Sequence, residues 1–396
     1  MDGSPLERRP KGLAARLGWV AFFNDAAGEV LARALPLFLT GVLGASAAFV
    51  GWVEGLAEAS SIILKGFSGW ISDRMESRKG MVVGGYALSV ASRALYLLGL
   101  GPLVLGAARV GDRIGKGLRN APRDAMIADA AKAGLSGRDF GLTRFLDTLG
   151  AMAGLALVAA LGLGHGPLDA RTFRICALLS LPLGLTALAL LVFAVPRIPR
   201  AVQAGRRLDW RIPRSIRGYL AIVLLFALAN SSDAFLVLKA RDAGFSFRAT
   251  LLLFLAFNAL AAALAVPAGR LSDRLGRVPF LTAGWVVYGL AYAVMGIAGT
   301  RTVFAVAFLG YGAFYGLTEG VEKALLADLL PAEDRGTGFG AFQSVVGLGA
   351  LAASPLMGLL MTRLGGRTAF LCAGGLALAS ALLLVLWSLA RRQASK

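Results

Sequence analysis

Gly69-Trp70-Ile71-Ser72-Asp73-Arg74 closes a long apolar stretch, and 200 positions later Gly269-Arg270-Leu271-Ser272-Asp273-Arg274 does the same. Two further dipeptides recur at an offset of 199 positions: Ala128-Asp129 with Ala327-Asp328, and Phe140-Gly141 with Phe339-Gly340. Three matches at nearly one offset indicate that the chain repeats one structural plan in two halves.

Long apolar segments surround both copies of this motif. Of the 396 residues, 57% are hydrophobic. Apolar runs of about 20 residues, the length a helix needs to cross a bilayer, recur from Leu17 to Leu389. The sequence therefore predicts an all-α polytopic membrane protein with twelve transmembrane helices in two pseudo-symmetric six-helix bundles. The expected spans are 17–42, 46–70, 80–100, 103–128, 140–163, 173–195, 216–238, 249–270, 280–299, 302–328, 337–361 and 368–389.

The span count divides the chain into three parts. We expect an N-terminal six-helix bundle over residues 1–195 and a C-terminal six-helix bundle over 216–396. Residues 196–215 between them are rich in arginine and proline and contain no apolar run, which is typical of an exposed cytoplasmic linker.

Basic residues are in excess, with 41 Lys and Arg against 23 Asp and Glu, for a net charge of +18. Many of them fall on one set of loops, including Arg8–Lys11, Arg74–Lys79, Arg197–Arg217 and Arg391–Arg392. The positive-inside rule places these loops and both termini in the cytoplasm. We therefore expect a multi-pass protein of the cell inner (cytoplasmic) membrane, with membrane lipids rather than nucleic acid as the partner of the basic residues.

The repeated motif, Gly-x-Leu-Ser-Asp-Arg-x-Gly-Arg between spans 2 and 3 of each half, resembles that of the major facilitator superfamily. The second copy fits it through Gly276 and Arg277, whereas Glu76 and Ser77 replace the usual Gly and Arg in the first copy. The resemblance implies that spans 1, 4, 7 and 10 line a central cavity, and that charges at the cytoplasmic edge latch the two halves. The gate residues it implies are Gly69, Asp73, Arg74, Asp129, Arg138, Gly269, Asp273, Arg274, Asp328 and Arg335.

Arg109 and Gly115 of span 4 resemble the superfamily's arginine motif, although Asp112 and Arg113 replace the usual Gln and Gly. Residues 112–125 (Asp-Arg-x-Gly-Lys-Gly-x-Arg-x-x-Pro-Arg-Asp-Ala) are similar to those of a bacterial subgroup of the superfamily. Span 5 contains Gly150-x-x-x-Gly154 without the proline of the antiporter motif, which weakens a drug-antiporter interpretation.

Ionisable residues within the spans are the best candidates for function, because a charge in hydrocarbon is costly unless it faces water or a partner. Asp25, Glu29 and Arg33 follow i, i+4, i+8 spacing on span 1, and span 4 carries a charged stripe from Arg109 to Arg123. An alternative is that these charges neutralise one another as structural pairs. The predicted substrate-binding residues are Arg33, Glu58, Arg109, Asp112, Arg113, Lys116, Arg119, Arg144, Asp147 and Glu319.

The acidic residues of spans 1 and 2 suggest coupling to protons. No phosphate-binding loop or ATPase motif occurs, so we expect a secondary active transporter that works by alternating access. A carboxylate that exchanges an arginine partner for a proton could link proton movement to transport. The predicted proton-coupling residues are Asp25, Glu29 and Glu54.

Five bases against two acids on the span-4 stripe favour a small anionic or zwitterionic substrate, because arginine forks bind carboxylate and phosphate. Two alternatives remain open: a broad-specificity drug or toxin efflux antiporter, and a non-transporting membrane receptor or lipid-handling protein. We expect no enzyme activity, no cofactor and no metal site, since the chain has 1 histidine and lacks a catalytic dyad. The expected partners are a small-molecule substrate, protons and lipids, and the expected state is a monomer.

Overall fold

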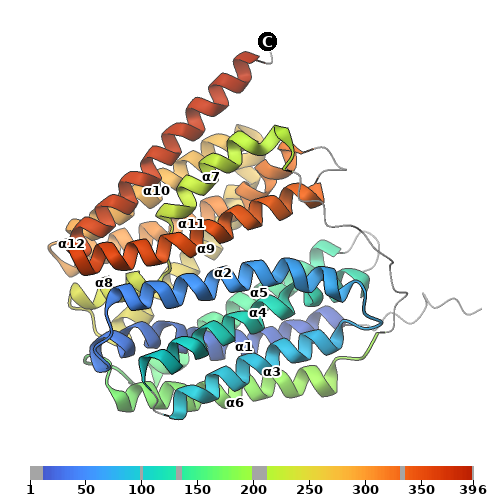
Figure 1. Ribbon diagram of the computed structural model, residues 1–396, viewed down its shortest axis with the longest axis vertical. Helices are drawn as coiled ribbons and strands as arrows, with labels where there is room; N and C mark the ends of the chain where they lie inside the picture. The colour runs from blue at the N-terminus through green and yellow to red at the C-terminus, as the bar shows by residue number, and fades with distance from the viewer. Residues whose placement is uncertain (1–11, 99–100, 131–135, 199–211, 331–334, 395–396) are drawn as a thin grey trace, which may run out of the picture. The chain divides into compact units, whose positions relative to one another are not determined.

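The computed structural model describes residues 12–98, 101–130, 136–198, 212–330 and 335–394. Helices form nearly all of the described chain, as predicted (Figure 1). The longer helices are α1 (Leu13–Leu37), α2 (Ala47–Ser72), α3 (Lys79–Ala94), α4 (Pro102–Ala130), α5 (Ser136–Ala160), α6 (Ala170–Ala194), α7 (Arg217–Ala229), α8 (Ala234–Asp242), α9 (Phe247–Leu275), α10 (Arg277–Ile297), α11 (Arg301–Leu329) and α12 (Arg335–Ala394). Short π and 3-10 turns are η2 (Phe38–Val42), η3 (Leu95–Leu98) and η4 (Arg214–Ile216).

Within the described residues these helices account for all twelve predicted spans. The predicted seventh span is broken into α7 and α8, and the last two spans are the two limbs of α12, which turns at Gly365. Gly365 has φ 82°, a conformation that favours glycine. Eight helical segments are both long and apolar enough to cross a membrane, and α12 supplies one segment that covers two spans. α1, α4 and α11 are not among them, since polar and ionisable residues interrupt their apolar faces.

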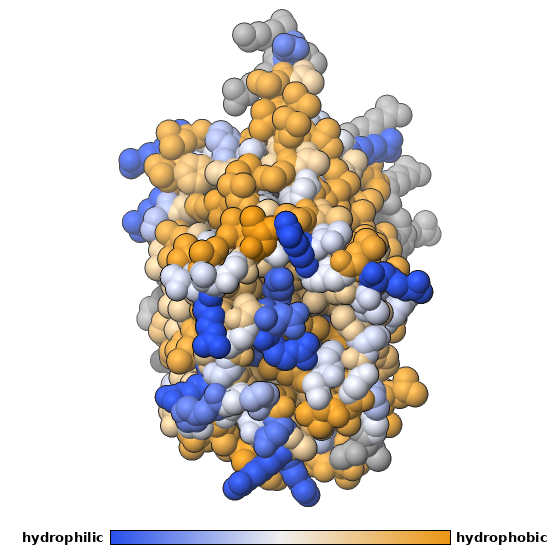
Figure 2. Space-filling model, turned by 90° about the vertical axis from the view of Figure 1, so that its left-hand side faces the viewer, coloured by the Kyte–Doolittle hydropathy of each residue, from blue (hydrophilic) through white to orange (hydrophobic). Residues whose placement is uncertain are grey.

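The outer surface of the helices is apolar, as lipid requires. Hydrophobic side chains cover most of the surface in Figure 2, and hydrophilic ones form separate groups among them. Phe193 of α6 is 86% exposed and Leu103 of α4 is 77% exposed. Side chains of this kind would be costly to place in water, so they indicate contact with acyl chains.

Contacts divide the chain into two compact units, and the boundaries between them fall inside α1 and α2 and near the end of α5 and the start of α6. Unit 1 contains residues 1–32, 60–158 and 171–207, and unit 2 contains residues 33–59, 159–170 and 208–396. The predicted bundles 1–195 and 216–396 rest on the sequence repeat and stay a prediction. Most of the predicted linker 196–215 lies outside the described residues.

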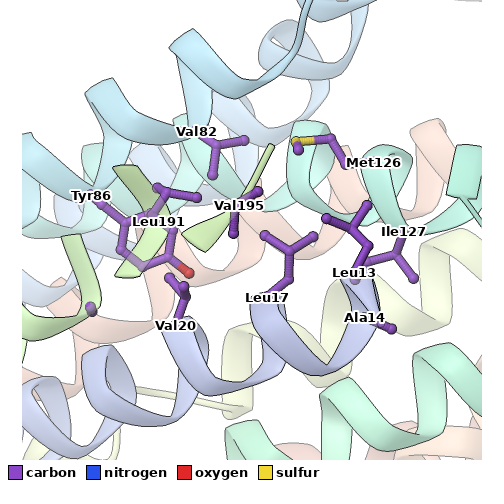
Figure 3. Packing of buried hydrophobic residues seen from close by; sticks show 11 residues of the cluster. Leu13, Ala14, Leu17, Val20, Val82, Tyr86, Met126, Ile127, Leu191 and Val195 are labelled. Atoms are coloured by element: carbon purple, nitrogen blue, oxygen red, sulfur yellow. The ribbon is translucent and has the colours of Figure 1, made fainter. Parts of the chain in front are cut away.

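An apolar cluster forms the core of one end of unit 1 (Figure 3). Leu13, Leu17 and Val20 of α1 pack against Val82 and Tyr86 of α3, and all five are at most 2% exposed. The cluster also contains Met126 and Ile127 of α4, Leu191 of α6, and Val195, which directly follows α6.

Glycines let α5 approach α1 closely. A Cβ at Gly150 would collide with the backbone of Phe22, and one at Gly154 would collide with the backbone of Ala26. These are the two glycines of the Gly-x-x-x-Gly sequence on span 5, so its role here is close helix packing. In unit 2 a glycine likewise allows close packing of α2 against α12, because Gly51 lies against the backbone of Ser354.

Replacing Gly154 with leucine should destabilise the protein by about 1–3 kcal/mol or more, because the added side chain forces α1 and α5 apart. Gly84→Leu is the matched control, since Gly84 is exposed on α3 and a Cβ there would meet nothing within 4 Å. Thermal melting of the detergent-purified protein measures the difference. Equal melting temperatures for the two variants would contradict the close α1–α5 contact.

Candidate functional site

A small polar cavity lies between α1, α3 and α4 in unit 1. Its volume is about 70 Å³, room for roughly two water molecules. Apart from Gly28 and Ala32, every residue that lines it is polar or charged. The lining consists of Asn24, Asp25, Gly28, Glu29, Ala32, Arg93, Arg109, Asp112, Arg113, Lys116 and Arg119.

A close crossing of α3 and α4 builds one wall of this cavity. A Cβ at Gly85 would lie 2.7 Å from the carbonyl oxygen of Gly115, nearer than real Cβ atoms come. Glycine at this position therefore allows the two backbones to approach. One turn further along α3, the Ser89 hydroxyl donates a hydrogen bond to the carbonyl oxygen of Asp112 at 3.2 Å. The crossing brings side chains of α3 into the cavity beside those of α4.

Arg93 of α3 forms an ion pair with Asp112 of α4, with 3.1 Å between Nη2 and Oδ1. The Arg93 side chain is only 2% exposed. Cβ atoms at Gly28 of α1 and Gly184 of α6 would lie 3.2 Å and 3.3 Å from its guanidinium nitrogens, so small residues make room for it. Four helices thus enclose one guanidinium group in the middle of unit 1.

Arg119 is a second buried base of the cavity. Its Nη1 donates a hydrogen bond to the Ser89 hydroxyl at 2.6 Å, and its guanidinium lies 4.6 Å from the centre of the Tyr86 ring. On the facing helix α1, Asn24 Nδ2 donates to Asp25 Oδ1 at 3.1 Å. The walls are therefore partly held by contacts within unit 1, which positions the charged groups before any ligand binds.

Arg123 joins two carboxylates outside the cavity lining. Its Nη2 lies 3.3 Å from both Asp124 Oδ1 and Asp147 Oδ2. Asp147, predicted to bind substrate, is therefore engaged by this arginine of α4. Arg144, predicted for the same role, is exposed on α5.

The structure brings together seven of the thirteen predicted substrate and proton residues. Asp25 and Glu29 share the cavity with Arg109, Asp112, Arg113, Lys116 and Arg119. The other six do not line the cavity. They include Glu58 of α2 and Glu319 of α11, which lies 3.7 Å from Lys323. The cavity nevertheless contains both predicted classes of residue, carboxylates and arginines, side by side.

Arg33 and Glu54 belong instead to a polar cluster in unit 2, at the break between α7 and α8. Arg33 Nη1 lies 3.0 Å from Asp233 Oδ2, and its guanidinium lies 3.8 Å from the centre of the Phe254 ring. The Ser232 hydroxyl donates to Glu54 Oε2 at 3.0 Å. The unwound residues of the break thus provide partners for charged residues of α1 and α2.

Tyrosines of α10 and α11 surround the same break. Tyr311 donates a hydrogen bond to Asp233 Oδ1 at 2.9 Å. Tyr288 donates to the carbonyl oxygen of Ala229 at 2.8 Å, and this carbonyl lies at the end of α7. Tyr288 also stacks on Tyr292, with ring centres 4.2 Å apart. The side chains that unit 2 packs here are largely aromatic, whereas those around the cavity of unit 1 are largely ionic.

The two repeated motifs differ in their turns, as their sequences suggest. Only Gly276, at φ 98°, separates α9 from α10, whereas residues 73–78 separate α2 from α3. In the second copy Arg277 pairs with Asp273 and lies 3.3 Å from Asp328. In the first copy Arg78 pairs with Asp73 at 2.6 Å, five residues away instead of four.

The remaining predicted gate residues have varied surroundings. Arg74 lies over the Trp70 ring at 3.7 Å, while Arg274 is exposed. Gly69 and Gly269 each accept a hydrogen bond through the backbone from the serine three residues on. The side chains of Asp129, Arg138 and Arg335 lie outside the described residues.

Several ionisable partners of the predicted site residues have no site role in the prediction from sequence, among them Arg93, Asp233, Arg78, Arg123 and Arg277. Arg93 and Asp233 are charges within apolar spans, but the resemblance places only spans 1, 4, 7 and 10 around the cavity and so leaves out span 3, which carries Arg93. The unwinding of span 7 had one local signal, the polar run Asn230-Ser231-Ser232-Asp233 in an otherwise apolar segment.

Comparison with known proteins places this arrangement in a family. A sequence model of the Major Facilitator Superfamily matches residues 17–255 and 218–396. The chain belongs to this superfamily. It is 33% identical over 384 residues to an uncharacterised transporter of the superfamily from Methanocaldococcus jannaschii, with 93% of each chain covered. The chain is thus a membrane transporter of this type and not an enzyme.

Solved structures show the same fold at low sequence identity. A nucleoside transporter matches with a TM-score of 0.77 and 14% identity, over 94% of this chain and 99% of that one. A peptide transporter of the POT family, bound to a peptide conjugate, matches with a TM-score of 0.80 and 13% identity, over 96% of each chain. These similarities support the fold. The nature of the substrate has to be inferred from the side chains of this chain.

The Arg33–Asp233 pair should be coupled energetically. Arg33→Met or Asp233→Leu alone breaks a largely buried ion pair and should cost up to about 3–5 kcal/mol. The double substitution removes both charges and should cost less than the sum of the two single losses. Thermal melting of the four proteins in detergent measures this coupling, and strictly additive losses would show that the pair does not interact.

Proposed function

We propose that this superfamily member is a proton-coupled secondary transporter that moves a small anionic or zwitterionic solute across the cell inner membrane by alternating access. The observation that supports it is the lining of the unit 1 cavity, in which five bases face three acids. Buried bases in excess attract an anion strongly, because screening by water is weak there. An apolar cation would gain little binding energy from such a lining, which argues against a drug-efflux function.

Proton coupling is proposed for Asp25 and Glu29, the two acids that α1 contributes to the cavity. Each lies among arginines and a lysine of α4 that can stabilise its charged form. A solute anion and these carboxylates compete for the same bases, so a proton carried on a carboxylate would leave the bases to the solute. Solute and proton binding would then favour each other, as symport requires. Glu54, hydrogen-bonded to Ser232 in unit 2, stays a proposed participant at the break of span 7.

The ion pairs of the repeated motifs are proposed to act in the cytoplasmic gate. Asp73 with Arg78, and Arg277 with Asp273 and Asp328, order the turns that follow α2 and α9. Both turns belong to loops predicted to be cytoplasmic, together with the two termini.

Arg113→Ala should weaken binding of the anionic substrate by about tenfold or more, because a hydrogen bond to a charged group contributes about 1.5–3 kcal/mol. A panel of small carboxylates, phosphate esters, amino acids, nucleosides and cationic dyes, scored by thermal stabilisation, identifies the ligand class. Arg174→Ala, an exposed residue of α6, is the control. If a cationic dye binds and no anion does, and Arg113→Ala leaves its binding unchanged, the proposal is wrong.

Asp25→Asn or Glu29→Gln should abolish accumulation driven by a pH gradient in proteoliposomes, while exchange of solute across the membrane persists. The physical reason is that an amide cannot carry the coupled proton. Glu76→Gln, exposed in the turn after α2, should accumulate solute like the parent. Unchanged gradient-driven accumulation in both cavity variants would rule out these carboxylates as the coupling groups.

A further inference from the structure

Resting on the proposed anion site, we infer that the cavity selects a doubly charged oxyanion group, such as a phosphate monoester, and that Arg93 is its specificity-determining contact. Span 3 supplies this residue, and its side chain lines the cavity beside the charged stripe of α4. Charge, hydrogen-bond donors and cavity size each lead to this assignment.

The charge of the lining fits a dianion. Arg93, Arg109, Arg113, Lys116 and Arg119 face three carboxylates, so two positive charges are in excess when all groups are ionised. A phosphate monoester carries about −1.5 to −2 charges near neutral pH, whereas a carboxylate or a phosphate diester carries one. Among the groups that line the cavity, a dianion therefore balances the whole two-charge difference, whereas a monoanion balances half of it.

The donors of Arg93 fit an oxyanion with several acceptors. Its Nη2 pairs with Asp112, while Nε and Nη1 have no hydrogen-bond partner among the described residues. These nitrogens are buried, with the whole side chain 2% exposed, so leaving their N–H groups unused is costly. A phosphate group offers three acceptor oxygens to such donors.

The cavity has room for the anionic head group of a solute. At about 70 Å³ it has room for roughly two water molecules, which is also the scale of one small tetrahedral oxyanion. An organic part of the solute would extend from this group toward the open side of the cavity. Recognition within the cavity then rests on the anionic group itself.

Asp112 is the internal competitor for this group. Its carboxylate holds one nitrogen of Arg93 at 3.1 Å, a place that a phosphate oxygen could take. Removing the Asp112 charge both releases Arg93 and raises the positive excess of the lining. Asp112→Asn should consequently bind a dianion several-fold more tightly, a gain that misfolding cannot produce.

The experiment is calorimetric titration of the full-length purified protein at pH 8 with methyl phosphate, a dianion, and dimethyl phosphate, a monoanion of similar shape. Acetate and succinate serve as carboxylate probes. We expect methyl phosphate to bind at least tenfold more tightly than dimethyl phosphate or acetate. Arg93→Met should lose at least tenfold in affinity for methyl phosphate, Arg93→Lys should lose less, and Arg174→Met should bind like the parent.

The outcomes separate this inference from the proposed function. If dimethyl phosphate or acetate binds as tightly as methyl phosphate, or if both Arg93 variants bind methyl phosphate like the parent, the inference is overturned and the anion site stands. If the parent binds none of the four anions, the anion site itself fails. Weaker binding of methyl phosphate by Asp112→Asn would overturn the role of Asp112 as competitor.

Discussion

Hydrocarbon does not tolerate a bare ion, and this constraint organises the interior of both units. A charged group within a span must find water, a counter-ion or a dipole, since its transfer to an apolar medium costs several kcal/mol or more. In unit 1 the charged groups meet in a small polar cavity, where carboxylates of α1 face bases of α3 and α4. In unit 2 the solution is a break in a helix, where Asp233 meets Arg33 and Ser232 meets Glu54.

The two solutions differ although the two halves repeat one plan. Small residues let α3 and α4 cross closely at Gly85 and Gly115, and charged side chains occupy the space beside the crossing. At the break of span 7, tyrosines such as Tyr288 and Tyr311 satisfy a backbone carbonyl and a carboxylate through their hydroxyls, and their rings fill the space by stacking. An ionic interior discriminates among solutes by charge, whereas an aromatic interior offers mainly shape and single hydroxyl donors.

The fold followed from the sequence because apolar length and the repeat at 199–200 positions are long-range, redundant signals. The structure brings only part of the predicted site into one cavity, and helix geometry explains why Arg33 lies apart from Asp25 and Glu29. Asp25, Glu29 and Arg33 step by four residues, and each such step rotates by about 40° around the helix. Arg33 is therefore about 80° away from Asp25. Ala32, seven residues after Asp25, stays on the cavity face, whereas Arg33 turns to Asp233 in unit 2.

The sequence could not reveal the role of Arg93 for a different reason. A single arginine in an apolar span is equally compatible with a lipid-edge position and a buried one, and the choice depends on glycines of other helices. Here Gly28 of α1 and Gly184 of α6 leave the space that its guanidinium occupies, and Asp112 of α4 supplies the counter-charge. Packing between residues far apart in the sequence therefore determines whether Arg93 is buried, and no local sequence pattern indicates this packing.

A transporter must release what it binds, and the acids of the cavity have a direct bearing on release. Five bases without counter-ions would hold a dianion tightly, and emptying such a site would leave several buried charges uncompensated. With Asp112 beside Arg93 the departing group is replaced at once by a carboxylate that is already 3.1 Å away. In the proposed site, the same carboxylates would reduce affinity for the solute and lower the free energy of the empty cavity. A cavity lined by bases alone would retain its anion. A cavity lined by bases and acids together would suit a carrier, which must be stable both with and without its solute.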